Sequence, residues 1–97
     1  MGKNLYISAL LDVYGAFLSD KSRALTEYYY NDDLSLSEIS ENEGITRQGV
    51  RDQIKRAEAQ LLSLEEKCHY CEKFLKLKDL ANDTENIEEI IEIINSL

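Results

Sequence analysis

The chain has 97 residues, a formal net charge of -8, 43% hydrophobic residues, four glycines and no proline. A chain of this length buries only about two-thirds of its unfolded surface, which leaves room for one core and no second domain. Helix-favouring residues are plentiful, so the composition favours an all-α fold. No stretch reaches the roughly 20 apolar residues of a membrane span, and the N-terminal segment does not resemble a secretory signal. We therefore expect one helical domain over residues 1–97, located in the cytoplasm.

Two amphipathic helices are predicted in the first third of the chain. Apolar residues at three- and four-residue steps predict a first helix that ends near Leu18. Ser19 or Asp20 can cap a second helix, which runs through Leu25 to about Tyr30. The polar segment NDDLS then predicts a turn.

Residues 35–57 have the spacing of a helix-turn-helix. Ser35 and Glu38 stand three residues apart and match a capping box, in which each side chain satisfies an amide at the start of a helix. This helix is short and runs from about residue 36 to residue 42. Gly44 can adopt the left-handed backbone that closes it, and Thr46 can cap the helix that follows.

The second helix of the motif is predicted to present a nucleic-acid-binding face. At about 100° per residue, Val50, Ile54 and Ala57 point towards the core, whereas the polar side chains cluster elsewhere. Arginine can bridge guanine, glutamine can pair with adenine, and cations near the end of the face suit phosphates. The predicted binding residues are Thr46, Arg47, Gln48, Arg51, Lys55 and Arg56.

Charge is unevenly distributed around this face. Residues 45–57 contain four basic residues and one acidic residue, whereas residues 27–44 and 79–97 each contain six acidic residues and no basic one. Acidic surfaces repel a duplex at long range, and about four contacts per chain are fewer than the 6 to 10 of tight salt-dependent binders. Binding would therefore need a dimer or a second protein. Alternatively, the basic residues only solvate the helix or pair with neighbouring acids.

A heptad pattern predicts one long helix after the motif. Apolar residues alternate steps of four and three, which is the spacing of a coiled coil, so the resulting seam needs a returning helix or a second copy of the chain. The segment ANDTEN can turn the chain into a terminal helix, whose glutamates would face water. The seam residues are Val50, Ile54, Ala57, Leu61, Leu64, Cys68, Cys71 and Leu75, and those of the terminal stripe are Ile87, Ile90, Ile91, Ile94 and Leu97.

The segment CHYC raises the question of a metal or redox site. A zinc site needs about four ligands, and the chain has no second cysteine pair to join Cys68 and Cys71. Haem attachment would require a histidine where Glu72 stands. Because both cysteines are expected in mid-helix, we interpret them as buried apolar residues, with zinc shared across a dimer as the alternative. His69 has no catalytic partner at a recognisable spacing, so we expect no enzymatic activity, no catalytic residues, no bound metal and no cofactor.

Three consecutive tyrosines allow two interpretations. The rings of Tyr28, Tyr29 and Tyr30 could stack on unpaired bases. Alternatively, two of the rings pack in the core beside Leu25 and Ile39, with their hydroxyls reaching water.

The stretch LSDKSRALTEYYYNDDLSLSEISENEGITRQGVRDQIKRAE resembles region 4 of the bacterial sigma factors, which reads the -35 promoter element. Over nearly its whole length the chain resembles the YlxM family of small proteins encoded with the signal recognition particle genes. The resemblance implies a sigma-region-4-like helical fold, self-association through C-terminal helices, and a regulatory role in the signal recognition particle pathway. The chain departs from the family pattern at Gly49, where alanine is more usual; glycine costs a helix interior about 1 kcal/mol. The family's recognition-helix stretch corresponds to Thr46, Arg47, Gln48, Val50, Ile54, Lys55 and Arg56.

These observations support three hypotheses for function. The first is a non-enzymatic, homodimeric regulator associated with the signal recognition particle, which contacts DNA or the particle's RNA through the second helix of the motif. The second is a protein adaptor that docks the particle's GTPase subunit or RNA polymerase on the same face. The third is a sequence-specific transcription regulator, which would bind a symmetric operator.

Overall fold

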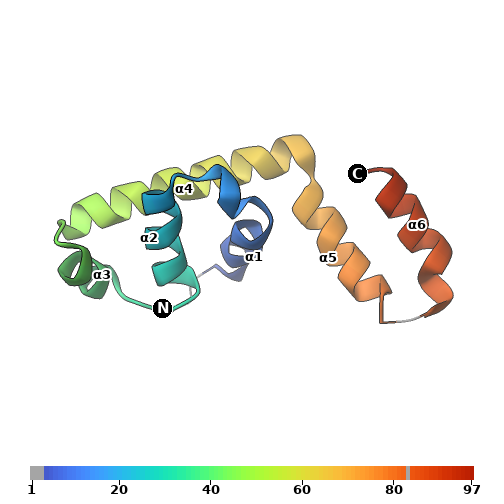
Figure 1. The fold of residues 1–97 in the computed structure, drawn as a ribbon, viewed down its shortest axis with the longest axis horizontal. Coiled ribbons are helices and arrows are strands. Elements are labelled where there is room, and N and C mark those ends of the chain that lie inside the picture. The colour runs from blue at the N-terminus through green and yellow to red at the C-terminus, as the bar shows by residue number, and fades with distance from the viewer. Residues whose placement is uncertain (1–3, 83) are drawn as a thin grey trace.

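The computed structural model describes residues 4–82 and 84–97, and all regular structure in that part of the chain is helical. The longest helix, α4 (Arg47–Cys68), forms the spine of the molecule. Three helices pack against one side of α4: α1 (Leu5–Tyr14), α2 (Asp20–Tyr30) and α3 (Leu36–Glu43) (Figure 1). A short 3-10 helix, Gly15–Phe17, links α1 to α2. The expected all-α fold with a helix-turn-helix at α3 and α4 is confirmed.

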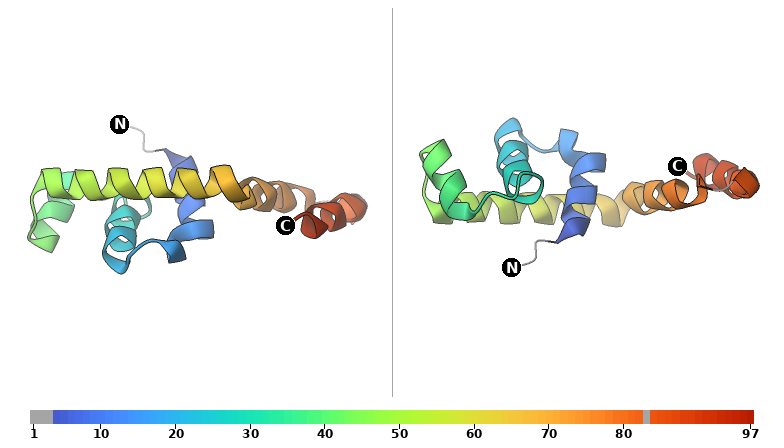
Figure 2. Two further views of the ribbon diagram at one scale, coloured as in Figure 1. Left: turned by 90° about the horizontal axis from the view of Figure 1, so that it is seen from above. Right: turned by 90° about the horizontal axis from the view of Figure 1, so that it is seen from below.

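The C-terminal quarter of the chain forms a helical hairpin that extends beyond the end of α4 (Figure 2). α5 (Tyr70–Leu80) leaves α4 at a bend, and α6 (Ile87–Asn95) returns beside α5 after the 3-10 turn Thr84–Asn86. Asp83, in the predicted turn segment, lies outside the described residues. The molecule measures 51 × 23 × 20 Å and its radius of gyration is 16.1 Å. A compact domain of about 100 residues has a radius of about 13 Å, so the hairpin elongates the molecule.

The predicted caps form as expected. The Ser19 hydroxyl accepts the amide of the third residue of α2 at 3.2 Å. Ser35 and Glu38 form a reciprocal capping box at the start of α3, with both bonds 3.1 Å long. Gly44 ends α3 in the left-handed conformation at φ 67°, and the Thr46 hydroxyl caps α4. Each cap satisfies an amide that the helix itself leaves without a partner.

The core consists of two adjoining clusters along α4. The first lies between α1, α4 and α5, and the second lies between α2, α3 and α4. Burying a large aliphatic side chain contributes about 1.5–3 kcal/mol, so these clusters supply most of the stabilisation of the fold. The first contains Ile7, Leu10, Leu11, Tyr14, Leu18, Ala57, Leu61 and Cys71, and the second contains Leu25, Ile39, Val50 and Ile54.

The predicted heptad seam is covered differently from our expectation. Its first four residues on α4, Val50 through Leu61, are buried by α1, α2 and α3 of the same chain. The terminal helix α6 packs against α5 instead. The expectation that the terminal helix would cover the seam is therefore wrong for Val50 to Leu61, although α6 does pack against α5, which carries the seam residues Cys71 and Leu75. The pattern was real, but a seam of this period fits any apolar partner and does not specify which one.

The expected uninterrupted helix is also wrong, because it breaks at His69. This residue adopts the left-handed conformation at φ 57° and separates α4 from α5. Cys68 is the last residue of α4 and Cys71 lies in the first turn of α5, so neither is in mid-helix. Cys71 is 1% exposed and belongs to the first core cluster, which confirms its apolar role. Both thiols are free.

Apolar residues of α6 face outwards. The predicted glutamates are exposed as expected. Within the isoleucine stripe, Ile87, Ile91 and Ile94 are exposed as well and Ile90 is half-buried, and α6 contains no fully buried residue. Phe74 and Leu75 of α5 are also about two-fifths exposed, at 40% and 42%. A contiguous exposed apolar patch on a small protein marks an interaction surface. The exposed large apolar residues here are Ile87, Ile91 and Ile94 of α6 and Leu97 just beyond it, at 60%, 51%, 52% and 46%.

Candidate nucleic-acid interface

The turn between α3 and α4 is held by hydrogen bonds to one serine. The Gly44 amide donates to the Ser40 carbonyl at 3.0 Å, and the Ser40 hydroxyl donates to the Ile45 carbonyl at 2.6 Å. A small residue at position 40 lets the two helices cross closely, and the Ser40 hydroxyl adds a hydrogen bond across the turn. The first two turns of α4 are thereby fixed relative to α3.

All six predicted binding residues are exposed at the N-terminal half of α4, but two already have partners. The Thr46 hydroxyl accepts the Gly49 amide at 3.0 Å as the helix cap. The Gln48 side-chain amide donates to Asp52 Oδ1 at 2.9 Å. These bonds reduce the capacity of both side chains to contact a ligand without rearrangement.

The four cations divide into two groups around the helix. Arg47, Arg51 and Lys55 follow one another at four-residue steps and form a stripe on the side of α4 that faces α3. Arg56 lies about 140° around the helix from Arg51, on the opposite flank. Within residues 4–82 and 84–97, none of these four cations forms an ion pair with a protein carboxylate. The alternative in which neighbouring acids neutralise the face therefore lacks the pairs it requires.

An acidic side chain occupies the outermost line of α4. Asp52 stands two residues from both Val50 and Ile54, about 160° around the helix from these buried residues. A carboxylate at the position that would penetrate deepest into a major groove opposes contact with a polyanion. Asp52 is not among the predicted site residues, although the same angular spacing along the helix places it on this line.

Beside the cationic stripe runs a groove between α4 and the elements α2 and α3. Three adjoining hollows of about 330, 360 and 310 Å³ follow this line, and Leu36 contributes to all three. Arg47 and Arg51 each line two of the hollows, and Tyr29 of α2 lines two. We call this feature the seam groove. Its walls combine apolar surface, the aromatic rings of Tyr29 and Tyr30, the three aligned cations and the carboxylates of Asp33, Glu38 and Glu58.

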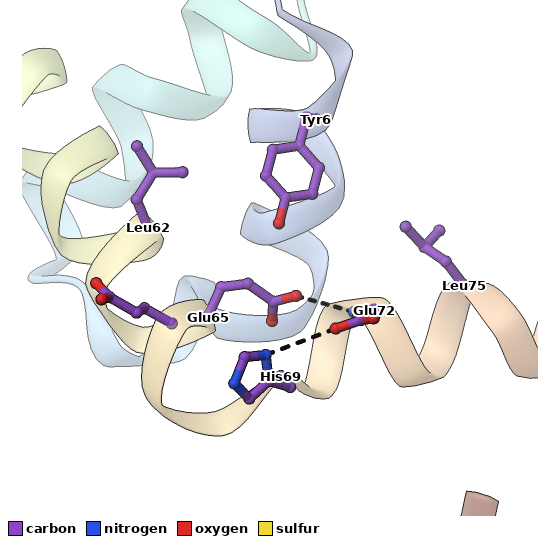
Figure 3. Close-up of a pocket in the computed structure, with 7 residues that line it drawn as sticks. Tyr6, Leu62, Glu65, His69, Glu72 and Leu75 are labelled. Atoms are coloured by element: carbon purple, nitrogen blue, oxygen red, sulfur yellow. Dashed lines mark hydrogen bonds and ion pairs between the residues drawn. The ribbon is translucent and has the colours of Figure 1, made fainter.

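A second constellation lies at the junction of α4 and α5, around the buried carboxylate of Glu65 (Figure 3). Glu65 Oε1 accepts the Tyr14 hydroxyl at 2.6 Å and the Cys71 amide at 2.9 Å, and Oε2 accepts the Glu72 amide at 3.0 Å. The Tyr14 hydroxyl in turn accepts the Tyr70 amide at 3.1 Å. The pair therefore satisfies three amides at the start of α5, as a side-chain cap does.

The ionisation of this pair reflects its surroundings. Burial acts to raise the pKa of Glu65, but the hydrogen bonds from Tyr14, Cys71 and Glu72 outweigh it and lower the pKa below the ordinary value. Burial, together with the bond to Glu65, raises the pKa of Tyr14 to about 12. Burial also raises the pKa of the Cys71 thiol, which opposes formation of a reactive thiolate. The junction is thus arranged to hold the bend.

A pocket of about 500 Å³ opens beside this junction, between α1, α4 and α5 (Figure 3). Three glutamates and His69 line it together with Tyr6, Leu62 and Leu75, and His69 Nδ1 lies 3.5 Å from Glu72 Oε2. This excess of carboxylates repels polyanions. Among the described residues, no group of three or more His, Cys, Asp or Glu side chains is placed to hold a metal ion.

The capped turn and the exposed second helix define a helix-turn-helix protein of the all-α class. A family model described as helix-turn-helix protein, YlxM / p13 like, matches residues 1–96, and the chain belongs to this family. A relative from Clostridium kluyveri is 40% identical over 97 residues, covering 100% of this chain and 82% of the relative. One from Thermoanaerobacter sp. (strain X514) is 44% identical over 90 residues, covering 93% and 74%. The YlxM protein of Bacillus subtilis is 39% identical over 102 residues, covering 98% and 93%.

In the part of the chain that the structure describes, no helix has the length and apolar character needed to cross a membrane.

Proposed function

We propose that this protein is a non-enzymatic cytoplasmic regulator, associated with the signal recognition particle pathway, that contacts DNA or the particle's RNA through α4. One observation supports this most directly: Arg47, Arg51, Lys55 and Arg56 are exposed and unpaired among the described residues, although the chain has a net charge of -8. Exposed cations that form no ion pair with the abundant carboxylates are available for phosphates.

The number of cations limits the strength of this contact. One chain offers four cations on two flanks of α4, fewer than the 6 to 10 phosphate contacts of strongly salt-dependent binders. We therefore propose that the protein acts as a homodimer, in which two copies of α4 add their contacts. Linking two weak sites raises affinity without any new type of contact.

The α5–α6 hairpin provides the surface for this dimer. Its exposed apolar residues extend over both helices, and burying them against a second copy removes them from water. α5 contains the cations Lys73, Lys76 and Lys78, whereas α6 contains glutamates. Two copies of the hairpin can therefore match α5 of one with α6 of the other in charge as well as in apolar character.

Titration of fluorescently labelled duplex DNA and signal recognition particle RNA at about 50 mM salt tests the nucleic-acid contact. We expect binding in the micromolar range that weakens as salt increases. Failure to bind either ligand at this salt concentration contradicts the proposal.

A protein adaptor remains the second candidate, and charge reversal separates the two. The variant Arg47→Glu/Arg51→Glu removes the phosphate contacts, so nucleic-acid binding should be lost. If the variant instead retains capture of the particle's GTPase subunit or RNA polymerase in pull-downs that resist nuclease, α4 serves as a protein dock. A sequence-specific transcription regulator would differ from both, because it would select a symmetric operator from a random DNA library.

A further inference from the structure

We propose that the seam groove binds an unpaired nucleobase, so that the ligand of α4 is a bulged or single-stranded nucleic acid and not a uniform duplex. This inference rests on the proposed function and specifies the class of ligand. It follows from the position of the cations, the shape of the groove and the placement of one tyrosine.

The cationic stripe directs phosphates to the flank of α4. Arg47, Arg51 and Lys55 border the groove, whereas the outermost line of the helix presents Asp52 and its hydrogen-bonded partner Gln48. A polyanion approaching head-on meets a carboxylate. A backbone that follows the flank meets three cations in succession, at intervals of about 6 Å along the helix axis.

The hollow lined by Arg51 and Lys55, at the end of the groove farthest along α4, has the size of a small-molecule site. Its volume of about 360 Å³ lies within the range of about 300–1,000 Å³ that is usual for such sites. Leu36 and Ile54 supply apolar surface, Tyr29 and Tyr30 supply aromatic rings, and Glu58 contributes the one carboxylate, whose charge is engaged by the Tyr30 hydroxyl. Arg51 and Lys55 stand at the same hollow, where they can hold the phosphates on either side of an inserted base.

The ring of Tyr29 is held in place by its neighbour. Tyr29 and Tyr30 pack edge to face, with ring centroids 5.0 Å apart and planes at 88°. Tyr30 is fixed in turn by the hydrogen bond that its hydroxyl donates to the Glu58 carboxylate. A fixed, half-buried ring beside two cations is the arrangement that stacks on a base, because stacking needs a flat surface that does not have to be ordered on binding.

Bases of an intact duplex cannot enter such a hollow, since they are stacked and paired. Recognition of unpaired bases by aromatic rings and flanking cations is the usual route to specific contact with RNA. The acidic surface around α4 further favours an unpaired ligand over a duplex, because a duplex without an extruded base makes only the weak phosphate contacts. The groove therefore discriminates by structure, between paired and unpaired nucleotides.

The test compares hairpins that differ by one unpaired nucleotide. RNA and DNA hairpins of the same stem, closed by a non-nucleotide linker so that no loop base is unpaired, are titrated with and without a single bulged nucleotide by fluorescence anisotropy. We expect the bulged form of at least one of the two to bind about tenfold more tightly than its paired counterpart. Both RNA and DNA are tested because an unpaired base of either can enter the groove. A preference for one of them shows which nucleic acid is the ligand.

Substitutions at Tyr29 assign the preference to the groove. Tyr29→Phe keeps the ring and should keep the preference for the bulge, whereas Tyr29→Leu should reduce it to less than about twofold. Tyr28→Leu is the matched control, because Tyr28 packs against the same core cluster but does not line the hollow. Thermal unfolding establishes that each variant is folded.

A measurement on the unaltered protein covers the case in which Tyr29→Leu fails to fold. A bulged 5-iodouridine is photocrosslinked to the protein, and the attached residue is identified by mass spectrometry. Attachment at Tyr29 supports the inference, and attachment only at residues outside the groove overturns it. Equal binding of paired and bulged hairpins overturns the inference and leaves the proposed function standing, whereas binding of neither at low salt overturns both.

Discussion

The hydroxyl of Tyr14 and the carboxylate of Glu65, 51 positions apart in the chain, form a buried hydrogen bond of 2.6 Å. This bond joins α1 to α4 at the point where the chain bends into α5. Because the same two side chains also accept three amides of α5, they fix the direction in which the hairpin leaves the spine. The bend at His69 therefore depends on a contact between distant segments and not on local sequence alone.

Tyr14→Phe should destabilise the fold by about 1.5–3 kcal/mol, because a hydrogen bond to a buried charged group is lost and the Tyr70 amide loses its acceptor. Urea unfolding followed by circular dichroism measures the difference. Tyr28→Phe is the control: it removes a hydroxyl from a half-buried tyrosine that makes no side-chain hydrogen bond within the described residues, and it should change stability by less than about 0.5 kcal/mol. Equal effects of the two variants would contradict the role given to Tyr14.

Stability should fall at acidic pH in a manner that depends on Glu65. The pKa of this carboxyl is lowered in the folded state, so the stabilisation is present above the ordinary glutamate value of about 4.3. It is lost as the pH falls through the lower, folded-state pKa. Glu65→Gln cannot ionise, so its free energy of unfolding should be smaller at neutral pH and should change less between about pH 5 and pH 3. If the free energy of unfolding depended on pH in the same way in the parent protein and in Glu65→Gln, Glu65 would not be the group responsible.

Two glycines of the helix-turn-helix should respond oppositely to alanine. Gly44 has φ 67°, and an added Cβ meets no atom within 4 Å, so Gly44→Ala should cost about 1–2 kcal/mol through the backbone alone. Gly49 lies within α4, where alanine is favoured by about 1 kcal/mol. An added Cβ there would lie 3.1 Å from the Thr46 hydroxyl, which offsets part of that gain. Thermal unfolding should therefore rank Gly49→Ala at or above the parent protein and Gly44→Ala below it.

Self-association should depend on the outer face of α6. Ile91→Glu places a charge in the middle of the exposed stripe and should raise the dimer dissociation constant at least about tenfold, as measured by analytical ultracentrifugation. Leu62→Glu alters an apolar residue of α4 that is similarly exposed, 46% compared with 51% for Ile91, and should leave the dimer intact. A parent protein that stays monomeric at high concentration would rule out the proposed dimer.

Features encoded by neighbouring residues were predictable from the sequence. The caps at Ser19, Ser35 and Thr46 and the left-handed Gly44 each depend on a few consecutive residues, and the structure confirms all of them. The candidate binding residues were predicted from their angular spacing on one helix, and this spacing also depends only on neighbouring residues. Their exposure agrees with the expectation, and their role in binding stays a prediction.

The bend and its consequences were not predictable in the same way. The heptad pattern continues through His69 without a glycine or proline, so nothing local indicates a break. The carboxylate that caps α5 lies at Glu65 within α4, and its partner Tyr14 comes from α1. Only the tertiary structure brings these groups together. The seam groove was missed for the same reason, because Tyr29 and the cations of α4 belong to different helices.

The salt dependence of nucleic-acid binding tests most directly whether the cations of α4 contact phosphates. The logarithm of the binding constant should fall linearly with the logarithm of salt concentration, and Arg47→Glu/Arg51→Glu should lower both the affinity and the slope, by about one per lost contact. Lys21→Glu/Lys67→Glu makes the same change in net charge at exposed residues of α2 and of the last turn of α4, away from the cationic stripe and from the α5–α6 hairpin, and should preserve the slope. If both variants change the slope equally, or if neither does, α4 is not the surface that meets the phosphate backbone.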